Sequence, residues 1–148
     1  MKLKGPWRQP EVDGFLTASR LPVRLAAITE SGRPMLVSLW YMWRDGALWC
    51  ASPMQADIVR ALRNNSACAF EVSVETPPYF GVRGQGRVDL LDGGKAQLRD
   101  LLKRYGGDPE SDFGTWLLGR DVEEATLRLT PDRMTSWDFR SRMAGAFD

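Results

Sequence analysis

The sequence contains no histidine among its 148 residues. This absence excludes Ser-His-Asp and Cys-His triads, zinc-binding helices of the H-E-x-x-H type and histidine-ligated haem. The two cysteines, Cys50 and Cys68, lie far apart without C-x-x-C spacing, so neither a structural zinc site nor any other metal site is expected. Any chemistry must therefore depend on a bound organic cofactor or on carboxylates.

Long apolar runs and a strong net charge are also missing. No segment approaches the roughly 18 apolar residues that span a bilayer, and the first twenty residues hold no apolar run of the signal-peptide type. The net charge of +1 gives no electrostatic reason to bind nucleic acid. The cysteines are expected to be buried free thiols, which fits a reducing cytoplasm. The missing apolar runs and the low net charge predict that neither a membrane nor nucleic acid is a partner.

The residues that are present predict an ordinary globular protein. Apolar residues make up 43% of the chain and charged residues 26%, which favours a single domain over residues 1–148. The six tryptophans favour core filling and interface area over ring stacking on a ligand. Acidic pairs lie in turns, and no side chain is a convincing general base, so the catalytic residues stay unassigned.

Apolar periodicity and turn signals predict a mainly β protein with peripheral helices. The expected strands cover residues 23–29, 35–43, 47–51, 67–74, 80–91, 124–130 and 133–139, and the expected helices cover residues 11–19, 52–65 and 92–105, with a short helical piece around 113–117. Segment 35–43 is apolar at nearly every position, so we expect cover on both faces. Short hairpins and few βαβ units predict a small closed or split antiparallel barrel.

Two turn-forming patterns refine this prediction. Asp45-Gly46 is a strong hairpin signal between two strands. Gly81, Gly84 and Gly86 lie inside one expected strand. They do not open a helix, as a dinucleotide-binding fingerprint would require. We therefore expect a bulge or a close backbone approach at these glycines.

The stretch WCASPMQADIVRALRNN predicts a strand that leads into a helix. Ser52 is expected to cap this helix by accepting a backbone N–H from Gln55 or its neighbour. The same geometry would direct the N–H groups of Met54, Gln55 and Ala56 outward, where the helix dipole favours an anion. Capping and phosphate binding compete for the same donors, and local chemistry does not decide between them.

The run GRPMLVSLWYMWRDGALWCASPMQADIVRALRNNSACAFEVS, followed by PPYFGVRGQGRVDLL, resembles the pyridoxamine 5′-phosphate oxidase-like flavin-binding split β-barrel proteins. Later segments agree, namely KRYGG and LRLTPDRMTSWDF. The resemblance covers most of the chain. It implies a six-stranded antiparallel split β-barrel of the FMN-binding type and a homodimer with two cofactor sites at the subunit interface.

The resemblance also implies a set of cofactor-binding residues. One strand would lay its backbone along the flavin ring, and the end of the next strand with the following helix start would hold the phosphate. A residue of the terminal strand would reach the partner's pocket. These residues are Val37, Ser38, Leu39, Trp40, Ala51, Ser52, Gln55, Ala56 and Trp137.

The sequence departs from the family at the residues that would bind the phosphate of the cofactor. The family often carries an Arg-Lys pair early in the helix, where this chain has Asp57 and Ile58. An aspartate repels a phosphate by about 1 kcal/mol at roughly 4 Å even in water. Arg60, one turn further on, or Arg63 could turn back towards the phosphate, so Asp57 and Arg60 complete the expected site.

Three functions stay open from the sequence. The first is an FMN-binding oxidoreductase that uses the flavin for hydride transfer with a small-molecule substrate. The second keeps the fold and replaces FMN by a deazaflavin, whose tail carries extra acidic groups. The third is a dimeric binding or sensing protein without a cofactor.

Overall fold

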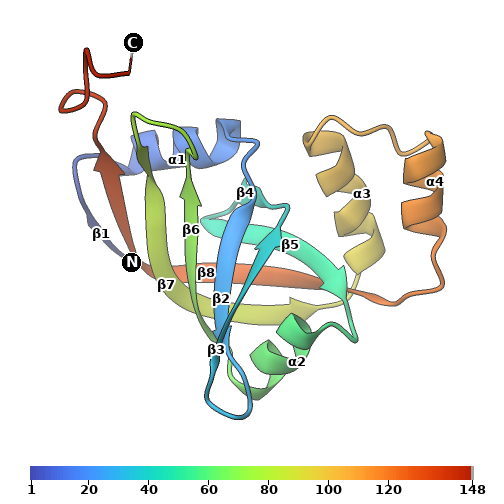
Figure 1. The fold of residues 1–148 in the computed structure, drawn as a ribbon. Helices are drawn as coiled ribbons and strands as arrows, with labels where there is room; N and C mark the ends of the chain where they lie inside the picture. The colour runs from blue at the N-terminus through green and yellow to red at the C-terminus, as the bar shows by residue number, and fades with distance from the viewer. Residues whose placement is uncertain (148) are drawn as a thin grey trace.

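The architecture comes from a computed structural model, which describes residues 1–147. Figure 1 shows one curled sheet with helices at its ends and along one side. No helix of the described residues is both long and apolar enough to cross a membrane. The elements are β1 (Lys2–Lys4), α1 (Gln9–Ala18), β2 (Val23–Ile28), β3 (Pro34–Leu39), β4 (Met42–Arg44), β5 (Ala47–Pro53), α2 (Asp57–Asn64), β6 (Ala67–Ser73), β7 (Phe80–Leu91), α3 (Gly94–Arg104), α4 (Asp112–Gly119) and β8 (Glu124–Asp138).

All eight strands of the described residues join one sheet in the order β3-β2-β6-β7-β8-β5-β4, with β1 added alongside β8. Every pair is antiparallel except β1 and β8. The sheet curls until β3, at one end of the order, contacts β5 near the other. The predicted mainly β split barrel is therefore confirmed. The described residues form eight strands, against six from the resemblance and seven from the segment analysis. Strand β1 was not predicted, segment 35–43 forms two strands, and segments 124–130 and 133–139 form one.

The core lies inside the curl of the sheet. Alternate residues of β2, β6 and β8 point inward, and Leu25, Phe70 and Leu127 are almost fully buried. Helix α1 lies across one end of the curl and α2 lies at the opposite end, where its apolar face closes the core (Figure 1). Cys50 and Cys68 are both free and buried within this core, as expected.

The hairpin between β4 and β5 turns at Asp45 and Gly46, as predicted. Arg44 pairs with Ala47 across the two-residue loop. The backbone φ angles are +52° at Asp45 and +69° at Gly46. A type I′ turn requires positive φ at both central residues, which aspartate tolerates and glycine adopts without strain.

The predicted close backbone approach occurs at the glycine-rich strand β7, opposite a bulge in β8 whose extra residue is Asp132. The register against β8 shifts between Gln85 and Gly86. A side chain at Gly86 would begin 2.2 Å from the carbonyl oxygen of Thr130, so the two backbones approach too closely for a Cβ atom. Because Pro131 pairs with Gly86 across this shift, β8 continues through it. The expected break at Pro131-Asp132 was wrong: one bulged strand replaces the two expected.

Segment 35–43 does not form one strand covered on both faces. Strand β3 ends at Leu39 and β4 begins at Met42. Between them, the backbone N–H of Tyr41 donates to the Tyr105 hydroxyl at 3.1 Å instead of to a neighbouring strand. Leu36 on β3 is 68% exposed, so one chain alone does not cover both faces of this segment, and cover by a second copy stays a prediction.

The helix expected at 52–65 begins later. Strand β5 extends through Ser52 to Pro53, because both residues keep their pairing with β8. Helix α2 starts at Asp57, with Ala56 as its N-cap and no capping hydrogen bond from a side chain. The prediction that Ser52 caps the helix was therefore wrong. Ladder pairing to β8 outweighs the local start signal of the Ser-Pro step.

Candidate functional site

The sheet is left open between β3 and the second half of β5. Strand β3 pairs with β2 alone, and β4 covers only Ala47–Trp49 of β5. Among the described residues, the facing edges of β3 and of segment 50–53 therefore have no strand partner. We call this gap the seam. Unpaired edge N–H and C=O groups can hydrogen-bond a ligand in place of a strand.

A cavity of about 340 Å³ lies at the seam, between the two strand edges and helix α3. We call it the seam cavity. Four of the nine residues that the resemblance assigned to a cofactor line it, and the other lining residues come from the loop before β2 and from α3. The full set is Pro22, Ser38, Leu39, Trp40, Ala51, Leu98 and Leu101. Apolar walls beside a backbone edge suit a flat ring system with a polar rim.

The lining of the seam cavity contains no titratable side chain. The carboxyl groups with shifted pKa values lie elsewhere. Burial raises the pKa of Glu124 despite the Arg120 guanidinium 2.9 Å away. Hydrogen bonds from Arg140 lower the pKa of Asp138 to about 2. An acid–base role for the lining is therefore excluded, and redox chemistry there needs a bound group.

The residues expected at the phosphate do not form a cradle around the seam cavity. Ser52 is only 4% exposed and lies in β5. The N–H of Met54 donates to the Glu123 carbonyl at 2.8 Å, and that of Ala56 donates to the Pro53 carbonyl at 2.9 Å. Backbone partners therefore use two of the three donors predicted for an anion.

The basic residues of α2 lie on its exposed face. The Arg60 guanidinium is 3.2 Å from the Asp57 carboxylate, and Arg63 Nη2 lies 3.3 Å from the Met54 sulfur. Both members of the Asp57–Arg60 pair are mostly exposed, so their attraction is weak. Neither arginine lines the seam cavity. Arg60 already faces a carboxylate that any phosphate would have to displace or tolerate.

An aromatic wall that the sequence did not indicate stands beside the seam cavity. The Trp40 indole stacks on the Tyr105 ring, with centroids 5.2 Å apart and planes 17° from parallel. Tyr105 donates its hydroxyl hydrogen to the Leu21 carbonyl at 2.9 Å and accepts the N–H of Tyr41. Burial raises the pKa of Tyr105, which keeps the hydroxyl protonated. Tyr105 lies in the segment KRYGG, which the sequence analysis used only as part of the resemblance, without predicting a role for the tyrosine.

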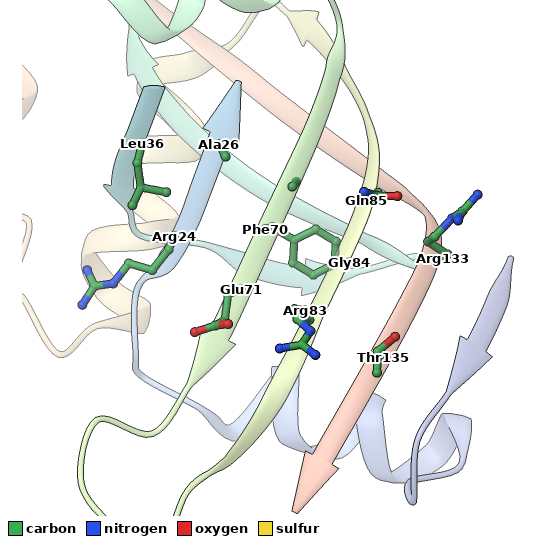
Figure 2. A pocket seen from close by; sticks show the side chains of 11 residues that line it. Arg24, Ala26, Leu36, Phe70, Glu71, Arg83, Gly84, Gln85, Arg133 and Thr135 are labelled. Atoms are coloured by element: carbon green, nitrogen blue, oxygen red, sulfur yellow. The ribbon is translucent and has the colours of Figure 1, made fainter. Parts of the chain in front are cut away.

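A second hollow, which we call the outer groove, lies on the outside of the sheet (Figure 2). Its volume is about 570 Å³, and its lining comes from β3, β2, β6, β7 and β8. Ala26, Leu36 and Ala69 form an apolar centre on three adjacent strands. Groove and seam cavity share β3, where Leu36 lines the former and Ser38 the latter.

Charged side chains form a row beside this apolar centre. Glu71 lies between Arg24 and Arg83 in the register of three neighbouring strands, and Figure 2 shows Glu71 and Arg83 side by side. Arg24 Nη1 donates to the Ser38 hydroxyl at 2.6 Å, which links the groove to the seam cavity. Trp137 belongs to this side, because the Arg83 guanidinium lies 5.2 Å from its ring. Within one chain, Trp137 does not line the seam cavity.

Comparisons with known proteins place the fold. No family model and no curated protein matches the sequence. A conserved hypothetical protein from Mycobacterium tuberculosis matches with a TM-score of 0.75 and 24% identity, over 93% of this chain and 88% of that one. An F420 reductase matches with a TM-score of 0.62 and 22% identity, over 80% and 92%. A candidate pyridoxamine 5′-phosphate oxidase from Listeria innocua matches with a TM-score of 0.65 and 10% identity, over 86% and 95%.

These likenesses establish the class of fold. The chain has the split β-barrel architecture of the pyridoxamine 5′-phosphate oxidase-like proteins, which its sequence resembles. The curled sheet, the uncovered edge of β3 and the peripheral helices are the features of this chain that carry the architecture.

Proposed function

We propose that the protein binds a flavin-type cofactor, FMN in the first instance, in the seam cavity and acts as an oxidoreductase on a small-molecule substrate. The observation that carries this proposal is the seam cavity itself. It combines an unpaired backbone edge with apolar walls and an aromatic wall, and its lining has no titratable group. Similarity to an F420 reductase and to a candidate pyridoxamine 5′-phosphate oxidase supports the proposal.

The residues of the chain would bind and orient the ring. The backbone edge at Ser38–Trp40 offers N–H and C=O groups to the polar rim of the ring system. Leu98 and Leu101 exclude water from its face. When bound, the flavin supplies hydride chemistry, and the absence of a titratable wall leaves proton exchange to the substrate and solvent.

The proposal includes a homodimer formed through the outer groove. Leu36 and Ile28 are large apolar side chains exposed on this face, and a second copy would remove them from water. The row Arg24, Glu71 and Arg83 can be partly self-complementary about a two-fold axis, because an offset of one strand lets one arginine of each copy face Glu71 of the other. Groups from both copies would then surround the seam.

A deazaflavin is the second candidate, and the start of α2 favours it. Asp57 faces Arg60 at 3.2 Å, where a compact phosphate would otherwise bind. A longer tail with several acidic groups would not depend on this one position, because it could reach other guanidinium groups beyond α2.

Titration with FMN, riboflavin and the deazaflavin tests the proposal. We expect quenching of flavin fluorescence and a shifted visible absorbance spectrum on addition of the protein. The Ala51→Phe variant fills the seam cavity and should weaken binding by at least about tenfold. Ala96→Phe, on the exposed face of α3, is the matched control and should bind as the wild type does.

Three outcomes separate the candidates. Tighter binding of FMN than of the deazaflavin supports the first candidate, and the reverse order supports the second. A stable dimer that binds neither ligand would overturn the proposal and favour a binding or sensing protein without a cofactor.

A further inference from the structure

The interruption of the strand predicted over residues 35–43 has a specific cause outside that segment. Tyr105, at the end of α3, accepts the backbone N–H of Tyr41 at 3.1 Å and donates to the Leu21 carbonyl at 2.9 Å. One hydroxyl therefore ties the loop after β3 to the loop before β2. Trp40 lies between the end of β3 and this hydrogen bond, directly before Tyr41.

The same tyrosine also fixes the Trp40 side chain. The two rings stack at 5.2 Å with planes only 17° apart. Trp40 also lines the seam cavity, whereas Tyr105 does not. Tyr105 thus supports the indole from outside the cavity and leaves part of the indole surface for a ligand. Stacked aromatic pairs of this geometry attract each other beyond the effect of their buried area.

Two neighbours of Tyr105, namely Arg104 and Tyr41, are held by the end of helix α1. Arg104 Nη2 donates to the carbonyls of Leu16 at 3.0 Å and Thr17 at 3.1 Å. The Arg104 guanidinium lies 4.9 Å from the Tyr41 ring and 5.3 Å from the Tyr105 ring. Tyr41 donates its own hydroxyl hydrogen to the Leu16 carbonyl at 2.8 Å. The aromatic wall is therefore fixed in the ligand-free protein, which reduces the ordering that binding would require.

We propose that Tyr105 is a positioning residue for the ring of the cofactor. It holds Trp40 in a fixed plane at the seam cavity, so that the indole selects a flat aromatic ligand. This role rests on the proposed function, because it concerns the same cavity. Tyr105 would thus affect how the ring of the cofactor binds, whether or not the cofactor carries a phosphate or an acidic tail.

Two variants divide the contribution of Tyr105 into its parts. Tyr105→Phe removes the two hydrogen bonds of the hydroxyl and keeps the ring stack on Trp40. Tyr105→Leu removes the two hydrogen bonds and the ring stack. The matched control is Tyr79→Phe, because Tyr79 is exposed and lines neither hollow. Riboflavin, which lacks the phosphate, and FMN are the ligands. We expect both to bind about threefold more weakly to Tyr105→Phe and at least about tenfold more weakly to Tyr105→Leu.

Readouts that do not depend on affinity separate positioning from general destabilisation. Amide exchange at Tyr41 should accelerate in both Tyr105 variants and remain unchanged in Tyr79→Phe. The visible circular dichroism of the bound flavin, which reports its fixed environment, should weaken most in Tyr105→Leu. Thermal unfolding of each variant checks that the protein stays folded at the titration temperature.

The outcomes distinguish this inference from the proposed function. If the wild type binds riboflavin and Tyr105→Leu binds it equally well with unchanged dichroism, the positioning role is overturned and the proposed function stands. If the wild type binds no flavin or deazaflavin, the proposed function fails and the positioning role fails with it. The expected gradient from wild type through Tyr105→Phe to Tyr105→Leu supports both.

Discussion

Strands β8 and β3 belong to the same sheet but differ in how fully their edges are paired and their side chains are buried. Strand β8 pairs along its length with β7, and β5 and β1 pair with its two halves on the other side. Its Leu127 is 1% exposed. Strand β3 pairs with β2 only, and its Leu36 is 68% exposed. The comparison indicates that the paired strands supply stability, whereas the uncovered edge of β3 is available for binding.

The largest expected difference between the buried core, to which Leu127 of β8 belongs, and the exposed edge of β3 is in thiol reactivity. Burial raises the pKa of Cys50 to about 12 and that of Cys68 to about 11. The reactive thiolate is therefore scarce at pH 8 and becomes populated only as the pH rises towards those values. We expect alkylation by iodoacetamide at least about 100-fold slower than at an exposed cysteine.

Leu36→Cys supplies that exposed cysteine on β3, in the same molecule. Mass spectrometry after timed alkylation measures all three sites together. Equal rates at the three sites would show that the core around Cys50 and Cys68 opens as readily as the β3 edge.

Truncating a side chain should cost more stability in β8 than in β3. Leu127→Ala leaves a cavity in the core and should lower the free energy of unfolding by about 2–5 kcal/mol. Leu36→Ala removes an exposed side chain and should change it by less than about 0.5 kcal/mol in a dilute monomer. Urea denaturation at low protein concentration measures both, and similar losses would contradict this difference.

Association should depend on the exposed side of β3 and its neighbours. Leu36→Asp and Ala69→Asp each place a carboxylate at the apolar centre of the outer groove. If the groove is the dimer interface, each should raise the dissociation constant of the dimer by at least about tenfold. Analytical ultracentrifugation measures it. Thr115→Asp, at an exposed position of α4, is the control, and a dimer that tolerates all three changes must use another face.

The smallest expected effect is at the start of α2. Asp57→Asn removes the charge that opposes a phosphate and releases Arg60 from its ion pair. FMN should bind about two- to fivefold more tightly, with a smaller gain at high salt, because exposed charges are screened. Riboflavin should not change. Asp100→Asn on the exposed side of α3 is the control, and an equal gain for riboflavin would show that the phosphate is elsewhere.

Local patterns in the sequence predicted much of the fold. The Asp45-Gly46 turn, the close backbone approach at the β7 glycines and the burial of both cysteines all follow from short-range chemistry and were correct. The errors occurred where distant pairing decides the local structure. Ser52 stays in a strand because β8 pairs with it, and the loop at Tyr41 forms because Tyr105 accepts its N–H.

At the candidate site, too, some residues were predicted from the sequence and others depend on distant contacts. Ser38, Leu39, Trp40 and Ala51 were named from the resemblance, and the structure brings them together at the seam cavity. Leu98, Leu101 and Tyr105 were missed, because α3 reaches the seam only after the whole sheet has curled. The cofactor-binding roles of Val37, Ser52, Gln55, Ala56 and Trp137 stay predictions.

The central claim is that the seam holds a flavin-type ring, and its most direct test is a fluorescence titration with riboflavin. Riboflavin presents the ring without a phosphate or an acidic tail, so the result depends on the seam cavity rather than on α2. We expect saturable quenching by the wild type and by Ala96→Phe, and at least about tenfold weaker binding by Ala51→Phe. Equal quenching by wild type and Ala51→Phe, or none by either, would contradict the claim.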